Sequence, residues 1–90
     1  MLERSVEITN SLGLHARAAA QLVRLAGLFR CRIMLKREDT GVTANAKSIL
    51  SVLHLAAGFG VRVSVTADGE DEAEAIAAIE KLILNGFGEI

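Results

Sequence analysis

His15 and Arg17 lie two positions apart at the start of a predicted helix, a spacing suited to binding and receiving an anion. The residues from Asn10 to Gly13 break the preceding strand pattern, and a helical pattern begins at Ala16. Because the first N–H groups of a helix have no partner inside it, the backbone amides of Ala16 and Arg17 point near the His15 ring, beside the positive end of the helix dipole. The planar guanidinium of Arg17 also fits phosphate oxygens. This setting favours a neutral imidazole that receives a phosphoryl group; the structural alternative is an N-cap histidine beside a solvated arginine.

A second candidate is Ser48, at the beginning of a short predicted helix that runs from about Lys47 to Ala56. A serine hydroxyl in this position caps free backbone N–H groups. The helix carries more apolar residues than the roughly 100° stripe that a surface helix buries. We expect Val52, Leu55 and Ala56 to face the core, with three apolar residues left outside it: Ile49, Leu50 and Leu53. Burial of the whole helix is the alternative.

The elements that must position these residues follow from hydrophobic periodicity. Alternating residues predict strands and a repeat of about 3.6 residues predicts helices. The predicted order is a strand over 2–9, a helix over 16–29, strands over 31–36 and 42–44, a helix over 47–56, a strand over 61–65 and a helix from 71 to 85. Asp71 and Glu74 have capping-box spacing at the start of the last helix. This order predicts an α+β sandwich with helices on one face of a mainly antiparallel sheet.

Length and composition favour a single globular domain over residues 1–90, with 51% apolar and 23% charged residues. Cys31 is the sole cysteine, so we expect no internal disulfide and no multi-cysteine metal site. We also expect no cofactor. No apolar run is long enough for a membrane span and the N-terminus lacks a signal-peptide pattern, which predicts a cytoplasmic protein without membrane insertion.

Charge is divided unevenly along the chain. Residues 1–47 carry a net +4 and residues 48–90 a net −5. A basic half of this kind suits an anion, an acidic partner or nucleic acid, and it also suits simple solvation. Tryptophan and tyrosine are absent and there are three phenylalanines, so a nucleic-acid surface built on stacked aromatic rings is disfavoured.

Three blocks of the sequence resemble the HPr family, the histidine phosphocarriers of the phosphoenolpyruvate-dependent phosphotransferase system. The block Gly13-Leu14-His15-Ala16-Arg17-Ala18-Ala19-Ala20 resembles that family's Gly-Leu-His-x-Arg-Pro-Ala signature. The block from Ala46 to Leu53 is similar to its Lys-Ser-Ile segment, and the block from Ala67 to Ala73 to its acidic turn into the last helix. The resemblance covers essentially the whole chain, apart from about two extra residues around Arg37 to Gly41.

The resemblance implies that His15 takes a phosphoryl group on Nδ1 from phosphorylated Enzyme I, with Arg17 stabilising the transferring charge. The acceptor would be a sugar-permease A domain or a nitrogen-branch protein, and the carrier would be a transfer intermediate rather than a stand-alone enzyme. The implied fold is the HPr open-faced sandwich, with four antiparallel strands and three helices on one face. Ser48 matches the serine that HPr kinase/phosphorylase modifies in many bacteria. We expect a monomer.

The same resemblance brings the exposed residues of the short helix next to the first helix. We define the docking patch as the apolar residues of this face together with two basic residues at its rim: Ala16, Ala20, Ile49, Leu50, Leu53, Arg24 and Lys47. An exposed apolar patch with a basic rim is typical of a protein-docking surface.

One departure from the family signature is Ala18, which stands where the family has proline. Proline fixes φ in the first turn without costing a hydrogen bond, so alanine is expected to keep the helix with a slightly looser turn. The alanine-rich run also resembles nitrogen-branch and divergent members, which leaves the branch open.

Two other functions are kept as alternatives. One is a regulatory interaction protein acting through Ser48 phosphorylation and the docking patch; the presence of His15 argues against its pure form. The other is a small nucleic-acid-binding domain, which rests on the basic half alone and predicts steeply salt-dependent binding.

Overall fold

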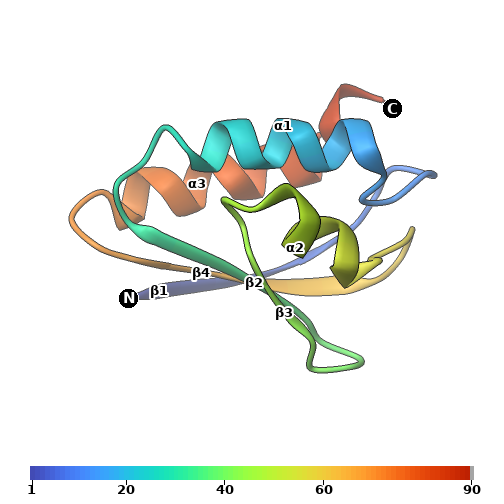
Figure 1. The fold of residues 1–90 in the computed structure, drawn as a ribbon, viewed down its shortest axis with the longest axis horizontal. Coiled ribbons are helices and arrows are strands. Elements are labelled where there is room, and N and C mark those ends of the chain that lie inside the picture. The colour runs from blue at the N-terminus through green and yellow to red at the C-terminus, as the bar shows by residue number, and fades with distance from the viewer. Residues whose placement is uncertain (90) are drawn as a thin grey trace.

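The computed structural model describes residues 1–89, which form a four-stranded antiparallel sheet covered on one face by helices (Figure 1). The sheet order is β1-β4-β2-β3. The strands are β1 (Leu2–Glu7), β2 (Arg32–Arg37), β3 (Thr43–Asn45) and β4 (Arg62–Asp68). The helices are α1 (Ala16–Ala26), α2 (Ile49–Leu55), α3 (Glu72–Leu84) and a 3-10 turn, η1 (Gly86–Gly88). The predicted open-faced sandwich is confirmed.

Period-two alternation decides which face of the sheet is covered. β4 pairs with β1 and β2 on its two sides, in a register that aligns Val65 with Arg4 and Leu35. Val63 and Val65 of β4 and Ile33 and Leu35 of β2 are fully buried beneath the helices. The alternate residues of these strands face the uncovered side, so one sheet face makes the core and the other stays polar.

α1 packs on the sheet through small and apolar residues, with Ala18, Ala19, Leu22 and Ala26 buried. The helix ends at Ala26, whereas the periodicity predicts it to run as far as Phe29. The amides of Leu28 and Phe29 bond to carbonyls only three residues back, so the chain tightens into a 3-10-type turn and leads into β2. The aromatic ring of Phe29 still packs against the core, from the loop rather than from the helix.

The predicted capping box at the start of α3 is wrong. Asp71 makes no side-chain cap; its carboxylate instead accepts hydrogen bonds from the backbone amides of Arg30 at 2.8 Å and Cys31 at 2.9 Å, just before β2. Gly69, with φ at +152°, lies so close to Cys31 that a Cβ there would come within 2.7 Å of the Cys31 Cβ. The turn before α3 is thus packed against the turn before β2. The backbone amides of Arg30 and Cys31, which lack other partners within residues 1–89, bind the Asp71 carboxylate.

No helix within residues 1–89 has the length and apolar character that a membrane crossing requires. The same residues contain no group of three or more His, Cys, Asp or Glu side chains gathered around a common metal position.

The Asp71 contacts predict a pH-dependent contribution to stability. The hydrogen bond from the Arg30 amide, followed by those from Cys31, lowers the pKa of Asp71 below its ordinary value. A carboxyl with a lowered folded-state pKa contributes stability above its unfolded-state pKa and loses that contribution as pH falls through the folded-state pKa. We expect Asp71→Asn to reduce the free energy of unfolding at pH 7, with the difference from wild type shrinking below about pH 4.

Urea unfolding of both proteins from pH 7 to pH 2.5 measures this difference. A gap between the two that stays constant across this range contradicts the assignment of these bonds to the ionised carboxylate.

Candidate functional site

His15 is the N-cap residue of α1, and its backbone starts the helix while its side chain stays free of it. Its carbonyl accepts the first helical bond from the Ala19 amide at 2.8 Å, and its own amide donates to the Gly13 carbonyl at 2.9 Å. The backbone is extended, with φ −76° and ψ 179°, and the ring makes no capping bond. The His15 side chain is 28% exposed. The imidazole is therefore held by its backbone at a helix terminus and reaches the surface.

The loop before His15 is fixed by close contact with the chain that follows α2. The Leu14 amide donates to the Ala57 carbonyl at 2.9 Å. Gly13 has φ +66°, and a Cβ at this position would lie only 2.6 Å from the Ala57 oxygen and the Gly58 Cα. Glycine is required here both by its backbone conformation and by this close approach.

Glu89 lies directly on the imidazole, although it is 74 residues away in sequence. Its Oε2 atom is 2.5 Å from Nε2 of His15, and its side chain is 19% exposed. The segment that carries it turns back beside the first turn of α1, where the red end of the ribbon lies in Figure 1. Phe87 is buried within η1, and its carbonyl accepts a hydrogen bond from the side-chain Nε2 of Gln21 on α1 at 3.3 Å. These contacts bring Glu89 to the site.

Asn10 holds the other oxygen of the same carboxylate. Its side-chain amide is fully buried and donates to Oε1 of Glu89 at 2.9 Å and to the Gly13 carbonyl at 2.8 Å. The bond from Asn10, and after it the bond from His15, lowers the pKa of the Glu89 carboxyl. Glu89 therefore stays ionised at neutral pH and can only accept, so the hydrogen between it and Nε2 belongs to the imidazole. In the neutral ring this leaves Nδ1 unprotonated, with a lone pair available.

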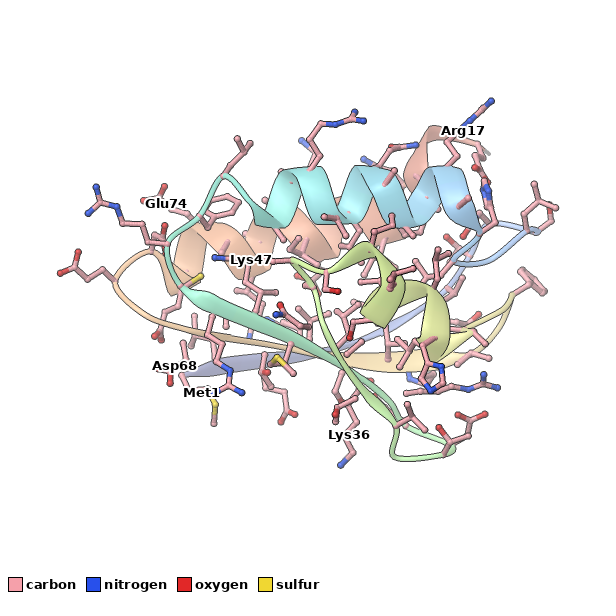
Figure 2. All side chains as sticks on the ribbon, viewed as in Figure 1. Met1, Arg17, Lys36, Lys47, Asp68 and Glu74 are labelled. Atoms are coloured by element: carbon pink, nitrogen blue, oxygen red, sulfur yellow. The ribbon has the colours of Figure 1, made fainter. Side chains whose placement is uncertain are left out.

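Arg17 lines a surface hollow together with His15. Its side chain is exposed and points outward at this end of α1 (Figure 2). The first turn of α1 contains no acidic residue. The hollow is lined by Ser11, Leu12, His15, Ala16, Arg17, Gly88 and Glu89. Ala16 and Arg17 thus line the same open hollow as His15. Their backbone amides and the Arg17 guanidinium are the groups predicted to bind phosphate.

Ala18, at the position of the family proline, lies inside α1 and is fully buried. α1 begins at Ala16 without the proline ring, so alanine preserves the helix start.

The docking patch has an exposed centre on α2. Leu50 is 76% and Ile49 38% exposed, whereas Leu53 is half-buried. α1 and α2 pack against each other, and on α1 Ala16 is exposed and Ala20 half-buried. The expected burial of Val52 and Leu55 is confirmed. The exposure of Leu50 and Ile49 rules out the alternative of a wholly buried helix.

The expectation that Ala56 faces the core is wrong. Ala56 is the exposed C-cap of α2, and its left-handed backbone, with φ at 53°, ends the helix before the side chain can turn inward.

The two basic rim residues of the docking patch differ in setting. Arg24 is exposed on α1. Lys47 donates from Nζ to the Phe29 carbonyl at 2.7 Å, which ties it to the loop between α1 and β2. Figure 2 shows Lys47 well away from Arg17 along the molecule.

Ser48 is the N-cap of α2, and its Oγ accepts a long hydrogen bond of 3.4 Å from the Ser51 amide. The predicted capping role is confirmed. Ser48 follows Lys47 directly in sequence, next to one rim residue of the docking patch.

Glu89 and Asn10 also belong to this site, although no sequence pattern predicts their place beside His15. In the sequence, Asn10 appears only as the end of a strand pattern, and Glu89 is a lone acid far from His15. The available signal is Phe87 between two glycines, an aromatic residue that must find a buried place near the C-terminal end.

Comparison with known proteins agrees with these features. The family model for the HPr component phosphorylation site of the phosphotransferase system matches residues 2–85. The phosphocarrier protein HPr of Cupriavidus necator is 49% identical over 89 residues, covering 99% of this chain and 98% of that protein. HPr of Neisseria meningitidis is 43% identical over the same length, with the same coverage of both chains.

Solved structures give the same answer. HPr of Thermoanaerobacter tengcongensis superimposes with a TM-score of 0.92 at 41% identity, covering 100% of this chain and 99% of that one. A second structure from that organism, described as an HPr dimer, gives a TM-score of 0.77 at 42% identity and covers 99% of this chain and all of the other. The family model matches most of the chain, the relatives span nearly its whole length, and the fold is shared. This chain therefore belongs to the HPr family of phosphotransferase-system phosphocarriers.

Proposed function

We propose that this protein carries a phosphoryl group on Nδ1 of His15, received from phosphorylated Enzyme I and passed to a permease A domain or a nitrogen-branch acceptor. The observation that carries the proposal is the Glu89 carboxylate on Nε2, at 2.5 Å, which leaves Nδ1 as the free nucleophile. The first amides of α1 and the Arg17 guanidinium, beside the same hollow, support it further.

The charge balance of the transfer fits these residues. The Nδ1 lone pair forms the N–P bond while the bond between phosphorus and the donor breaks, and its electron pair leaves with the donor. The ring keeps its Nε2 proton and becomes cationic, and the Glu89 carboxylate stabilises that cation. Arg17 and the amides of Ala16 and Arg17 stabilise the charge on the phosphoryl oxygens. Reversal of the same steps delivers the group to the acceptor, so no proton has to leave the protein.

The first prediction for this function concerns which residue accepts the phosphoryl group. With Enzyme I and phosphoenolpyruvate, the wild type is expected to gain one acid-labile phosphoryl group, and His15→Ala to gain none. His54→Ala is the control, because His54 is the other histidine of the chain and is exposed on α2. Intact-mass measurement before and after acid treatment reads the result. Equal labelling of His15→Ala and wild type rules out the proposal.

The second prediction concerns Arg17. Removing one group that stabilises transition-state charge typically costs 10²-fold or more in rate, and an exposed guanidinium belongs at the lower end. We therefore expect Arg17→Ala to slow phosphoryl transfer roughly 100-fold. Arg32→Ala, which removes an exposed arginine from β2, should leave the rate unchanged. Rapid-quench kinetics measure both; an Arg17→Ala protein as fast as wild type excludes a role in transfer.

The docking patch is proposed as the surface that meets Enzyme I and the acceptor. Its apolar centre at Leu50 is exposed and its rim carries the basic residues Arg24 and Lys47, which suits an apolar surface with an acidic rim on the partner. The support is exposure and charge, together with the position of Ala16 in the His15 hollow. Because Ala16 belongs to both the patch and the hollow, a partner on this patch would lie beside the imidazole.

The third prediction tests that surface with two leucines of equal exposure. Leu50 on α2 and Leu28 after α1 are both 76% exposed, and only Leu50 belongs to the docking patch. Leu50→Ala is expected to raise the KM for phosphorylated Enzyme I about tenfold, equivalent to 1.4 kcal/mol, with kcat little changed. Leu28→Ala should leave both constants unchanged. Equal effects of the two substitutions contradict the assignment of the patch.

Three further assignments stay predictions. Phosphorylation of Ser48 by an HPr kinase/phosphorylase is one; it would add about −2 charge at the N-terminus of α2. The cytoplasmic location and the monomeric state are the others. The regulatory alternative, which dispenses with His15, has no support from a site in which the imidazole is held and open.

A further inference from the structure

Asn10 is the sole polar residue among the fully buried side chains of residues 1–89, and it is only partly satisfied. Its amide nitrogen donates to the Gly13 carbonyl and to Oε1 of Glu89. Its oxygen, Oδ1, is buried and has no hydrogen-bond partner. An unpaired buried acceptor is destabilising, so an apolar side chain would serve packing better at this position.

The orientation of the Asn10 amide follows from its partners. The Gly13 carbonyl and the Glu89 carboxylate are both acceptors, so the NH2 group must face them. The reversed amide would point Oδ1 at a carboxylate and leave the Gly13 carbonyl without its donor. The orphaned Oδ1 is therefore the consequence of using both N–H groups on the phosphorylation site.

The two bonds have different consequences for His15. The bond to Gly13 fixes the loop from which the imidazole projects. The bond to Oε1 of Glu89 fixes the carboxylate, whose other oxygen then meets Nε2 of His15 at 2.5 Å. Without Asn10, the Glu89 side chain would keep a single anchoring bond, the one to the ring itself. It could then rotate toward Arg17 or solvent.

We propose that Asn10 is a positioning residue for phosphoryl transfer: by holding Glu89 from the protein interior, it keeps the proton of His15 on Nε2 and the lone pair of Nδ1 toward the hollow. Partners one step removed from a reacting group act in this way by fixing the orientation and proton position of the group they support. The consequence for transfer rests on the proposed function; the consequence for the imidazole proton does not.

The fourth prediction separates these two consequences. In Asn10→Ala labelled with ¹⁵N-histidine, we expect the minor tautomer with the proton on Nδ1 to rise several-fold over wild type at a pH where His15 is neutral. The transfer rate from Enzyme I should fall about tenfold, the smaller end of the effect of removing a supporting partner. Glu89→Ala should change both in the same direction.

The double variant tests whether Asn10 acts through Glu89. In the Glu89→Ala background, Asn10→Ala should add no further change to the tautomer ratio or the rate. Thr9→Val is the matched control. It removes the hydrogen bond from Thr9 Oγ1 to the Ile83 carbonyl at 3.3 Å, which does not involve Glu89. The His15 signals should therefore stay as in wild type. If Asn10→Ala does not fold, as judged by urea unfolding, Asn10→Ser replaces it.

The outcomes are distinct. Unchanged ring signals in a folded Asn10 variant overturn the proposal, as do effects that are fully additive with Glu89→Ala. A shifted tautomer together with a wild type that takes up no phosphoryl group upholds the positioning role and overturns the proposed function instead.

Discussion

The hydrogen bond from Nε2 of His15 to Glu89 is the constraint on which the functional account depends. It joins residues 74 apart and gives the two ring nitrogens different properties, one bound to a carboxylate and one open to the surface hollow. The fold brings the two residues together. The loop after β1 carries His15, and the chain after α3 returns to the same end of the sandwich (Figure 1). Buried Phe87 anchors that return, and buried Asn10 fixes its last step.

A carboxylate beside a phosphoryl acceptor brings an electrostatic conflict. In the proposed transfer, Glu89 would repel an incoming phosphoryl group, yet it would stabilise the positive charge that the ring gains when the N–P bond forms. Glu89 lines the same hollow as Ala16 and Arg17, so the Arg17 guanidinium and the first amides of α1 are the groups that would offset this repulsion. A carrier must release the phosphoryl group as readily as it receives it, and a carboxylate beside the bound group opposes holding it too tightly.

The sequence predicts what local physics determines. Apolar periodicity identifies the strands, the three helices and their buried faces, and residue type at a helix start identifies His15 and Arg17. It fails where a distant group competes with a local one. Asp71 has capping-box spacing but serves the amides of Arg30 and Cys31, and the helix expected to reach Phe29 ends at Ala26 in a tighter turn. Glu89 and Asn10 reach the imidazole site only through tertiary contacts, so no local pattern reveals them.

The most direct test of the central claim is ¹⁵N NMR of the phosphorylated protein, recorded with coupling to ³¹P. The account predicts that the coupling appears on Nδ1 of His15 and that Nε2 of the same ring still carries its proton, bound to Glu89. Coupling on Nε2 instead, or a phosphorylated ring whose Nε2 is deprotonated at neutral pH, would contradict it.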